Sequence, residues 1–270
     1  MYMKKIYIIT VLTFLFFKSQ SQDFLGISTG NFSGVTGVML QPASIVDSRY
    51  KFDINLYATS VNYSNNYFLV NRDALLKFNK NSFNNYQTFK ARYLSEASLE
   101  AGERVFLNIG NRTQMPLSFM VTTGKKSAIA LNIQSRSMIQ GRGITQELAK
   151  MAYNGFYSPA LNNNVIDASG FNLKALNWAE VGFTYGRVLY ASNKHFFKAA
   201  VTGKYLAGVA SLNMGSNDAR FSVNNDSSIN FNSNRFDYTH NKNADFDMTF
   251  NKNFSPDANA VGFDAGVVYE

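Results

Sequence analysis

The chain has 270 residues, of which 46% are apolar, 15% are aromatic and only 16% are charged, and its formal net charge is +8. So many aromatic side chains exclude a disordered chain. The absence of Cys excludes disulfides, Cys-based zinc or iron–sulfur sites and a thiol nucleophile. Because Asn, Ser, Thr, Tyr and Gly supply most of the polarity, the composition favours a sheet protein with two differently solvated faces over a helical enzyme.

The N-terminus has the layout of a secretory signal peptide. Two lysines, Lys4 and Lys5, precede the apolar run 6–17, and a small, polar stretch follows from Lys18 to Gln22. The apolar run would form a helix of roughly 18 Å, whereas a membrane helix needs about 20 residues. We therefore predict a cleaved signal peptide over 1–22, with an anchor helix as the alternative, and one exported domain over 23–270.

Later segments alternate apolar and polar residues with the period of a β-strand, and no later apolar run is long enough for a membrane helix. We predict strands at 51–59, 104–110, 116–123, 128–136, 179–187, 196–207 and 261–270. Helices are predicted at 72–80 and 145–153, with Asn71 and Thr145 as N-caps. Segment 86–99 is either a helix or irregular, 160–175 is a loop around one helical turn, and the Asn-rich 213–259 is a surface loop or a ribbon with a hairpin at 219–231.

The two faces of these strands differ in a way that is typical of a membrane barrel. One face is apolar and ends in aromatic residues, as the lipid-facing side of a barrel does. The other carries small residues and single charges of both signs, which would pair across an enclosed polar interior. These candidate lumen-facing residues are Asp53, Arg136, Glu180, Lys198, Lys204 and Asp264. The predicted fold class is therefore an all-β, antiparallel transmembrane β-barrel. A secreted β-sandwich, which shows the same alternation, is the alternative.

No catalytic or cofactor-binding pattern is present in the sequence. His195 and His240 are the only histidines, and neither has the spacing of a metal site or a catalytic motif. The acidic residues of the Asn-rich stretch match no calcium-loop pattern. The basic residues form no stripe of the kind that binds nucleic acid. We therefore expect no enzymatic activity, no cofactor, no metal and no nucleic-acid partner.

Three stretches resemble a family of Bacteroidetes outer-membrane proteins of unknown function. Segment 31–56 contains a Gln-Pro-Ala leader followed by a first strand, and 177–189 and 262–270 resemble two further strands of that family. The residues that match are Gln41, Pro42, Ala43, Asp53, Asn55, Trp178, Glu180 and Tyr185. Neighbouring gliding and type IX secretion barrels have similar openings.

The resemblance implies a barrel of about fourteen strands, often followed by an OmpA-like peptidoglycan-binding domain, with no known enzymatic activity. We count about seven to nine strands, and Glu270 falls inside a predicted strand, so we expect a barrel domain truncated at its C-terminus.

The function expected from these patterns is a structural or accessory role in the outer membrane. The partners would be outer-membrane lipid and envelope or secretion-machinery proteins. The alternatives are a channel or FadL-like uptake protein for a small or lipidic solute, and a secreted β-sandwich that acts as a binding module.

Overall fold

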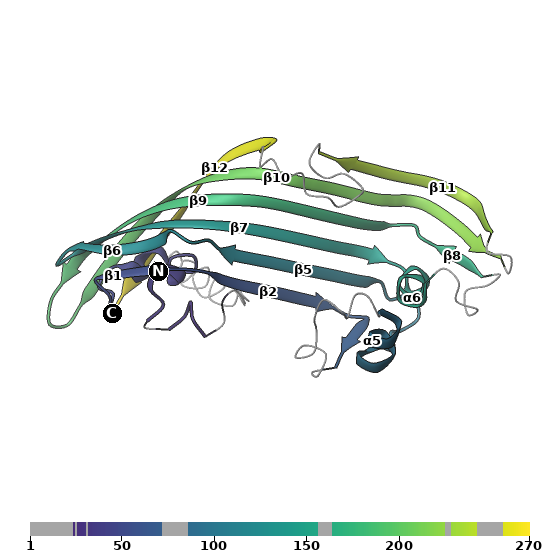
Figure 1. Cartoon of the computed structure of the whole chain (residues 1–270), viewed down its shortest axis with the longest axis horizontal. Coiled ribbons are helices and arrows are strands. Elements are labelled where there is room, and N and C mark those ends of the chain that lie inside the picture. The colour runs from purple at the N-terminus through teal and green to yellow at the C-terminus, as the bar shows by residue number, and fades with distance from the viewer. Residues whose placement is uncertain are drawn as a thin grey trace, which may run out of the picture.

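The computed structural model describes residues 24, 26–30, 32–71, 86–155, 164–224, 228–241 and 256–270. The predicted signal peptide and the predicted helix 72–80 lie outside the described residues. Within these ranges, the protein is one long, curved antiparallel sheet with short helices at its ends (Figure 1).

Ten strands form this sheet, and two further short strands pair with each other. The sheet contains β1 (Phe52–Asn55), β2 (Ala58–Asn65), β5 (Val105–Gln114), β6 (Ser118–Gly124), β7 (Ser127–Ile144), β8 (Val165–Asp167), β9 (Phe171–Ala191), β10 (Phe196–Val223), β11 (Ile229–His240) and β12 (Ala258–Tyr269). The small sheet contains β3 (Phe68–Val70) and β4 (Leu94–Glu96). The helical elements are α2 (Gly34–Gly37), the 3-10 turn η1 (Pro42–Ile45), α5 (Tyr86–Tyr93) and α6 (Gln146–Asn154).

The long strands β7, β9 and β10 form the centre of the sheet, and shorter strands share their flanks. β5 and β6 both pair with β7, and they continue to β2 and β1 respectively. On the other side, β12 pairs with the first half of β10 and β11 with the second half. The described strands therefore leave edges at β1 and β2 and at β11 and β12, and they do not close into a barrel.

Several predicted elements are confirmed and others need correction. The strand predicted at 51–59 is two strands, β1 and β2, which pair with different partners on either side of Leu56 and Tyr57. Of the loop predicted over 160–175, residues 160–163 lie outside the described residues, and for 164–175 the prediction is wrong, because β8 and the start of β9 lie there and pair with β10. For 213–223 and 229–240, the predicted ribbon is correct, since β10 and β11 form a hairpin. The described strands also outnumber the expected seven to nine.

Helix α6 confirms the predicted helix at 145–153 and its cap. Thr145 has an extended backbone, and its hydroxyl accepts a hydrogen bond from the Leu148 amide at 3.2 Å. Such a cap satisfies one of the amides that the first turn of a helix leaves unpaired. Segment 86–99 is helical only to Tyr93, where the chain turns into β4.

The carboxylate of Asp167, at the end of β8, fixes the turn into β9. Its Oδ1 atom accepts a hydrogen bond from the Ser169 amide at 2.8 Å. The hydrogen bonds from Ser169 lower the pKa of Asp167 below its ordinary value. Because the pKa of Asp167 is lower in the folded protein than in the unfolded chain, the ionised carboxylate stabilises the fold at pH values above the unfolded-state pKa. This stabilisation is lost as the pH falls through the folded-state pKa.

We therefore expect acid to destabilise the β8–β9 end of the wild-type sheet more than that of Asp167→Asn. Hydrogen exchange of the Ser169 and Ala168 amides, followed from about pH 5 to about pH 2, measures this difference. An equal loss of protection in both proteins, relative to the intrinsic exchange rate at each pH, would contradict the assignment.

The sheet has an outer face that is apolar and exposed over half its length. Register places apolar side chains of neighbouring strands in rows that cross the sheet. We call three of these rows the apolar belt: Phe52, Val121, Ile129, Tyr185 and Val201; Ile54, Phe119, Leu131, Phe183 and Phe263; and Ile133, Val181, Tyr205 and Val261. Phe183 is 54% exposed and Phe263 is 82% exposed.

The N-terminal segment, residues 32–50, covers the opposite, inner face at the end of the sheet that carries β1, β6 and the end of β12 (Figure 1). Val35, Val38, Ile45 and Val46 of this segment form a buried cluster with inner-face residues of β6, β7 and β9. Those sheet residues are Met120, Ala128, Ala130 and Val188. The main apolar core at this end therefore lies between the sheet and its own N-terminal segment, not between two sheets.

Two glycines on the inner face make room for this segment. A Cβ atom at Gly186 would lie 2.3 Å from Cγ2 of Val46, and one at Gly266 would lie 1.8 Å from Oε1 of Gln41. Both separations are far below van der Waals contact. A side chain at either position would therefore push the segment away from the sheet.

We expect Gly186→Ala to loosen the N-terminal segment. Overpacking costs about 1–3 kcal/mol, so a cysteine at buried position Val38 should react with a maleimide at least roughly fivefold faster. The chain has no Cys of its own, so the label reports only this site. The matched control is Gly203→Ala, where the nearest atom is a Phe263 ring carbon at 3.9 Å. Equal labelling rates in the two variants would show that the segment does not depend on Gly186.

Candidate functional site

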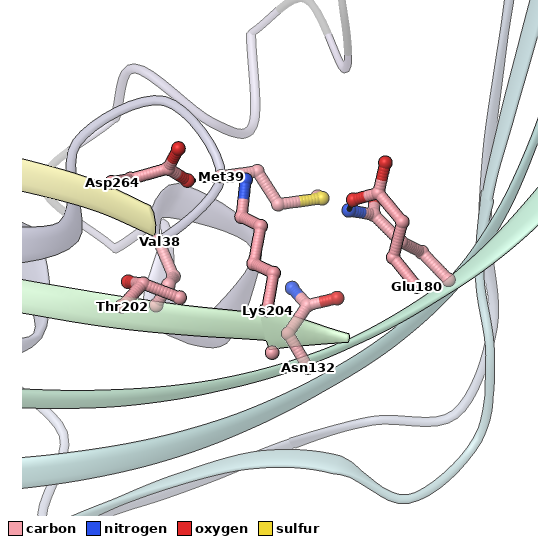
Figure 2. Close-up of a pocket in the computed structure, with 9 residues that line it drawn as sticks. Val38, Met39, Asn132, Glu180, Thr202, Lys204 and Asp264 are labelled. Atoms are coloured by element: carbon pink, nitrogen blue, oxygen red, sulfur yellow. Dashed lines mark hydrogen bonds and ion pairs between the residues drawn. The ribbon is translucent and has the colours of Figure 1, made fainter. Parts of the chain in front are cut away.

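The inner face carries a buried polar cluster where the N-terminal segment meets β7, β9, β10 and β12. A pocket lies here, and Figure 2 shows Met39 of the N-terminal segment extending over it. Its lining residues are Val38, Met39, Asn132, Gln134, Glu180, Gly182, Thr202, Lys204 and Asp264. Asn132 and Gln134 are each only 5% exposed. A soluble sheet would normally bury apolar side chains at such positions.

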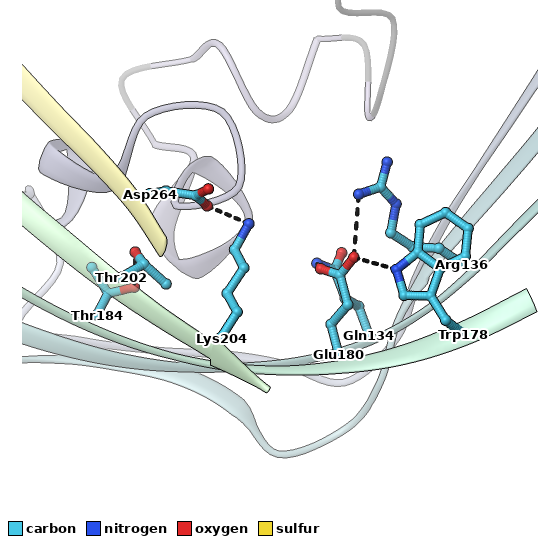
Figure 3. Close-up of polar contacts among 8 residues, drawn as sticks. All are labelled: Gln134, Arg136, Trp178, Glu180, Thr184, Thr202, Lys204 and Asp264. Carbon is cyan, nitrogen blue, oxygen red and sulfur yellow. Dashed lines mark hydrogen bonds and ion pairs between the residues drawn. The ribbon is translucent and has the colours of Figure 1, made fainter. Parts of the chain in front are cut away.

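Glu180 is the centre of one hydrogen-bond network in this cluster (Figure 3). Its side chain is 3% exposed, and Oε1 accepts a hydrogen bond from Nε1 of Trp178 at 2.6 Å and an ion-paired one from Arg136 at 3.2 Å. Oε2 accepts a hydrogen bond from the amide of Gln134. The Arg136 guanidinium also lies over the Trp178 ring, 4.9 Å from its centroid. Three donors therefore compensate the cost of burying this carboxylate.

Register explains why these four residues meet. Gln134 pairs with Glu180, and Arg136 pairs with Trp178, in the antiparallel β7–β9 ladder. Residues two apart on one strand share a face, so both pairs point to the inner side. The Trp178–Glu180 spacing was visible in the sequence, but the β7 partners depend on strand register.

A second polar group lies one strand further along the inner face (Figure 3). Lys204 of β10 forms an ion pair with Asp264 of β12. The hydroxyls of Thr184 and Thr202 are 2.7 Å apart and fully buried. Opposite charges thus pair across neighbouring strands of the inner face.

Most of the remaining sequence-predicted residues attach the N-terminal segment to the sheet, whereas Asn55 joins β1 to the end of β5. Asp53 accepts a hydrogen bond from the Val35 amide at 2.7 Å. Lys198 donates to the Val46 carbonyl at 3.0 Å. Gln41 donates to the Val267 carbonyl at 3.1 Å and caps η1, which contains the buried Pro42 and Ala43. Asn55 donates to the Gln114 carbonyl at 3.3 Å.

Tyr185 is placed differently from the other matched residues. It lies on the outer face in the apolar belt and is 45% exposed. Sequence reasoning did not identify the role of Thr36, whose hydroxyl donates to Oε1 of the buried Gln114 at 3.0 Å. No local signal indicates that contact, because the two residues are far apart in the chain.

The part of the chain that the structure describes brings no three His, Asp or Glu side chains together in a way that could hold a metal ion. His195 stacks on Tyr269 at the edge of the sheet, and His240 lies far away in β11. Among the described residues, no helix is long and apolar enough to cross a membrane.

A family model described as a family of unknown function, DUF5723, matches residues 42–270. The chain belongs to the DUF5723 family. The match begins at Pro42, inside the leader that docks on the inner face, and includes both polar groups of that face. No curated protein and no solved structure matches the chain.

Proposed function

We propose that the sheet of this DUF5723 chain forms part of the wall of an outer-membrane β-barrel. The protein would have a non-enzymatic, structural or accessory role in the cell envelope. The observation that carries the proposal is the inverted distribution of polarity. Glu180, Asn132 and Thr184 are buried on the inner face, whereas the apolar belt on the outer face is exposed. A protein in water gains stability by burying apolar side chains and exposing polar ones. A barrel in a membrane shows the reverse, with apolar side chains facing lipid and polar ones facing its interior.

The height of the belt supports the proposal. On β12, outward-facing residues from Val261 to Tyr269 are apolar, and four of them are more than 60% exposed. These positions span roughly 26 Å along the strand, or about 20 Å along the membrane normal for a strand tilted by about 40°, which is close to the height of an outer-membrane apolar band of about 25 Å. The outer row ends in Tyr190 and Tyr269, which would lie at one membrane interface.

The two alternative functions have less support. A secreted sandwich would cover the apolar belt with a second sheet, but none of the hydrophobic clusters in the described residues includes a belt residue of β9, β10 or β12. An open channel for a small or lipidic solute would need an unobstructed inner face. Here the N-terminal segment occupies one end of that face and is hydrogen-bonded to it at Asp53, Lys198 and Val267.

Membrane fractionation tests the proposal. We expect the protein to sediment with outer membranes, to resist extraction by carbonate, and to migrate faster on a denaturing gel before heating than after it. The same preparation reconstituted in planar bilayers should carry no ion current while the N-terminal segment is in place. Recovery of the folded protein from a soluble fraction without detergent would overturn the proposal.

A further inference from the structure

One end of the sheet carries an excess of exposed basic side chains. The short turns β6–β7 and β9–β10 lie at this end, together with the start of β1 and the end of β12. We call these side chains the basic rim: Arg49, Lys51, Lys125, Lys126, Arg187 and Lys194. All six are exposed. Thr122 donates its amide to the Lys51 carbonyl, which places Lys51 beside β6 at the same end.

Few acids balance this rim. Asp47 and Glu270 lie at the same end, but no ion pair joins a basic-rim side chain to a carboxylate of any described residue. The far end of the sheet is different, because acids such as Glu147, Asp218 and Asp237 alternate there with Lys150, Arg220 and Arg235. The positive charge is therefore concentrated at one end, and exposed unpaired charges of one sign attract anions.

The basic rim coincides with a row of aromatic residues at the border of the apolar belt. Tyr190, Phe197 and Tyr269 are register partners on β9, β10 and β12. Tyr190 and Tyr269 are exposed, and the Tyr269 hydroxyl lies 2.6 Å from Nδ1 of His195. Arg187 lies on the belt side of this row, and Lys194 lies in the turn beyond it. Aromatic side chains of this kind lie at the level of lipid headgroups.

We propose that the basic rim binds the phosphate of anionic phospholipid headgroups in the leaflet at the short-turn end of the sheet. This inference rests on the proposed function, because the apolar belt must first place the rim at a membrane surface. The charges then lie where headgroup phosphates would lie, and each Lys or Arg near an anionic surface adds attraction that salt screens. Inorganic phosphate could bind the same basic side chains, but it has no acyl chains to contact the adjoining apolar belt.

The experiment uses the full chain reconstituted in phosphatidylcholine vesicles that contain a minor fraction of fluorescent phosphatidylglycerol. The rim variant carries Lys125→Gln, Lys126→Gln, Arg187→Gln and Lys194→Gln. The matched control removes four exposed charges at the far end, through Arg142→Gln, Lys150→Gln, Lys174→Gln and Arg235→Gln. Fluorescence of Trp178, the only tryptophan, checks that each protein is folded.

We expect the wild-type protein to retain phosphatidylglycerol over phosphatidylcholine, and the rim variant to lose at least about tenfold of that preference. The control should change by less than about twofold, and salt should weaken the wild-type preference. Equal retention by the rim variant and the wild type would overturn the inference. Competition by inorganic phosphate at the concentration of the lipid would also overturn it, because the rim would then be a general anion site.

Failure of the proposed function gives a different result. A chain that does not insert into pure phosphatidylcholine vesicles is not a membrane barrel, whatever its charges do. A chain that inserts and shows no headgroup preference retains the proposed function and loses only the basic rim. Single Arg187→Gln, which removes one outward-facing charge, provides a milder variant if the fourfold substitution does not fold.

Discussion

Phe183→Arg is expected to destabilise the folded protein in a membrane by roughly 2–4 kcal/mol. Phe183 lies on the outer face in the middle row of the apolar belt and is 54% exposed. In water, a substitution at such an exposed position changes stability by only about 0.5 kcal/mol. In lipid, the same charge would have to leave water, so the effect is large. Urea unfolding in lipid vesicles, followed by Trp178 fluorescence, measures the change.

The matched control is Phe236→Arg in β11. Phe236 is 45% exposed, and it lies in the half of the sheet beyond the apolar belt. We expect it to cost less than about 1 kcal/mol, because its side chain stays in water in the proposed orientation. Small and equal effects of the two substitutions would contradict a lipid-facing belt and would indicate that both side chains face water.

Glu180→Ala is expected to cost roughly 2–3 kcal/mol of unfolding free energy. The substitution removes the acceptor of Trp178, Gln134 and Arg136, and it leaves the Gln134 donor buried and the Trp178 donor half-buried. Arg136 is one-third exposed, so its guanidinium can turn to water, which limits the cost. The Trp178 emission should shift as well, because its indole loses a charged partner at 2.6 Å.

Asp264→Asn provides the comparison for this buried network. It breaks the ion pair with Lys204, but Asp264 is 41% exposed and Lys204 is 22% exposed. Exposed ion pairs contribute at most about 1 kcal/mol, so this variant should be clearly milder than Glu180→Ala. Equal losses of unfolding free energy in the two variants would show that the burial of Glu180 does not set the size of the effect.

Local periodicity was enough to locate most of the long strands. The alternation at 128–136, 179–187 and 196–207 placed the centres of β7, β9 and β10, because a strand alternates its faces with a period of two residues. It underestimated their lengths, since the far halves of these strands mix polar and apolar residues without a regular alternation, and their apolar side chains, such as Phe171 and Phe221, pack in a cluster of their own. It also joined β1 to β2, because it missed the change of phase at Leu56 and Tyr57: the exposed positions are even-numbered in β1 but begin at odd-numbered Thr59 and Val61 in β2.

The inner cluster could be predicted only in part. Asp53, Arg136, Glu180, Lys198, Lys204 and Asp264 were assigned to the polar face, and all six side chains lie there and make polar contacts. Their partners could not be predicted, because a one-residue slip in register would reverse the faces and exchange every neighbour. The pairing of Arg136 with Glu180 depends on the β7–β9 register, and that of Lys204 with Asp264 on the β10–β12 register.

The sequence by itself determined that this chain is an antiparallel β protein with one apolar and one polar face, because alternation is a property of neighbouring residues. Only the tertiary structure decided that the apolar face is exposed and that residues 32–50 pack on one end of the opposite face. The contact between Gln41 and Val267 joins residues 226 positions apart. No local pattern encodes such a contact, since it exists only after the strands have aligned and the sheet has curved around its N-terminal segment.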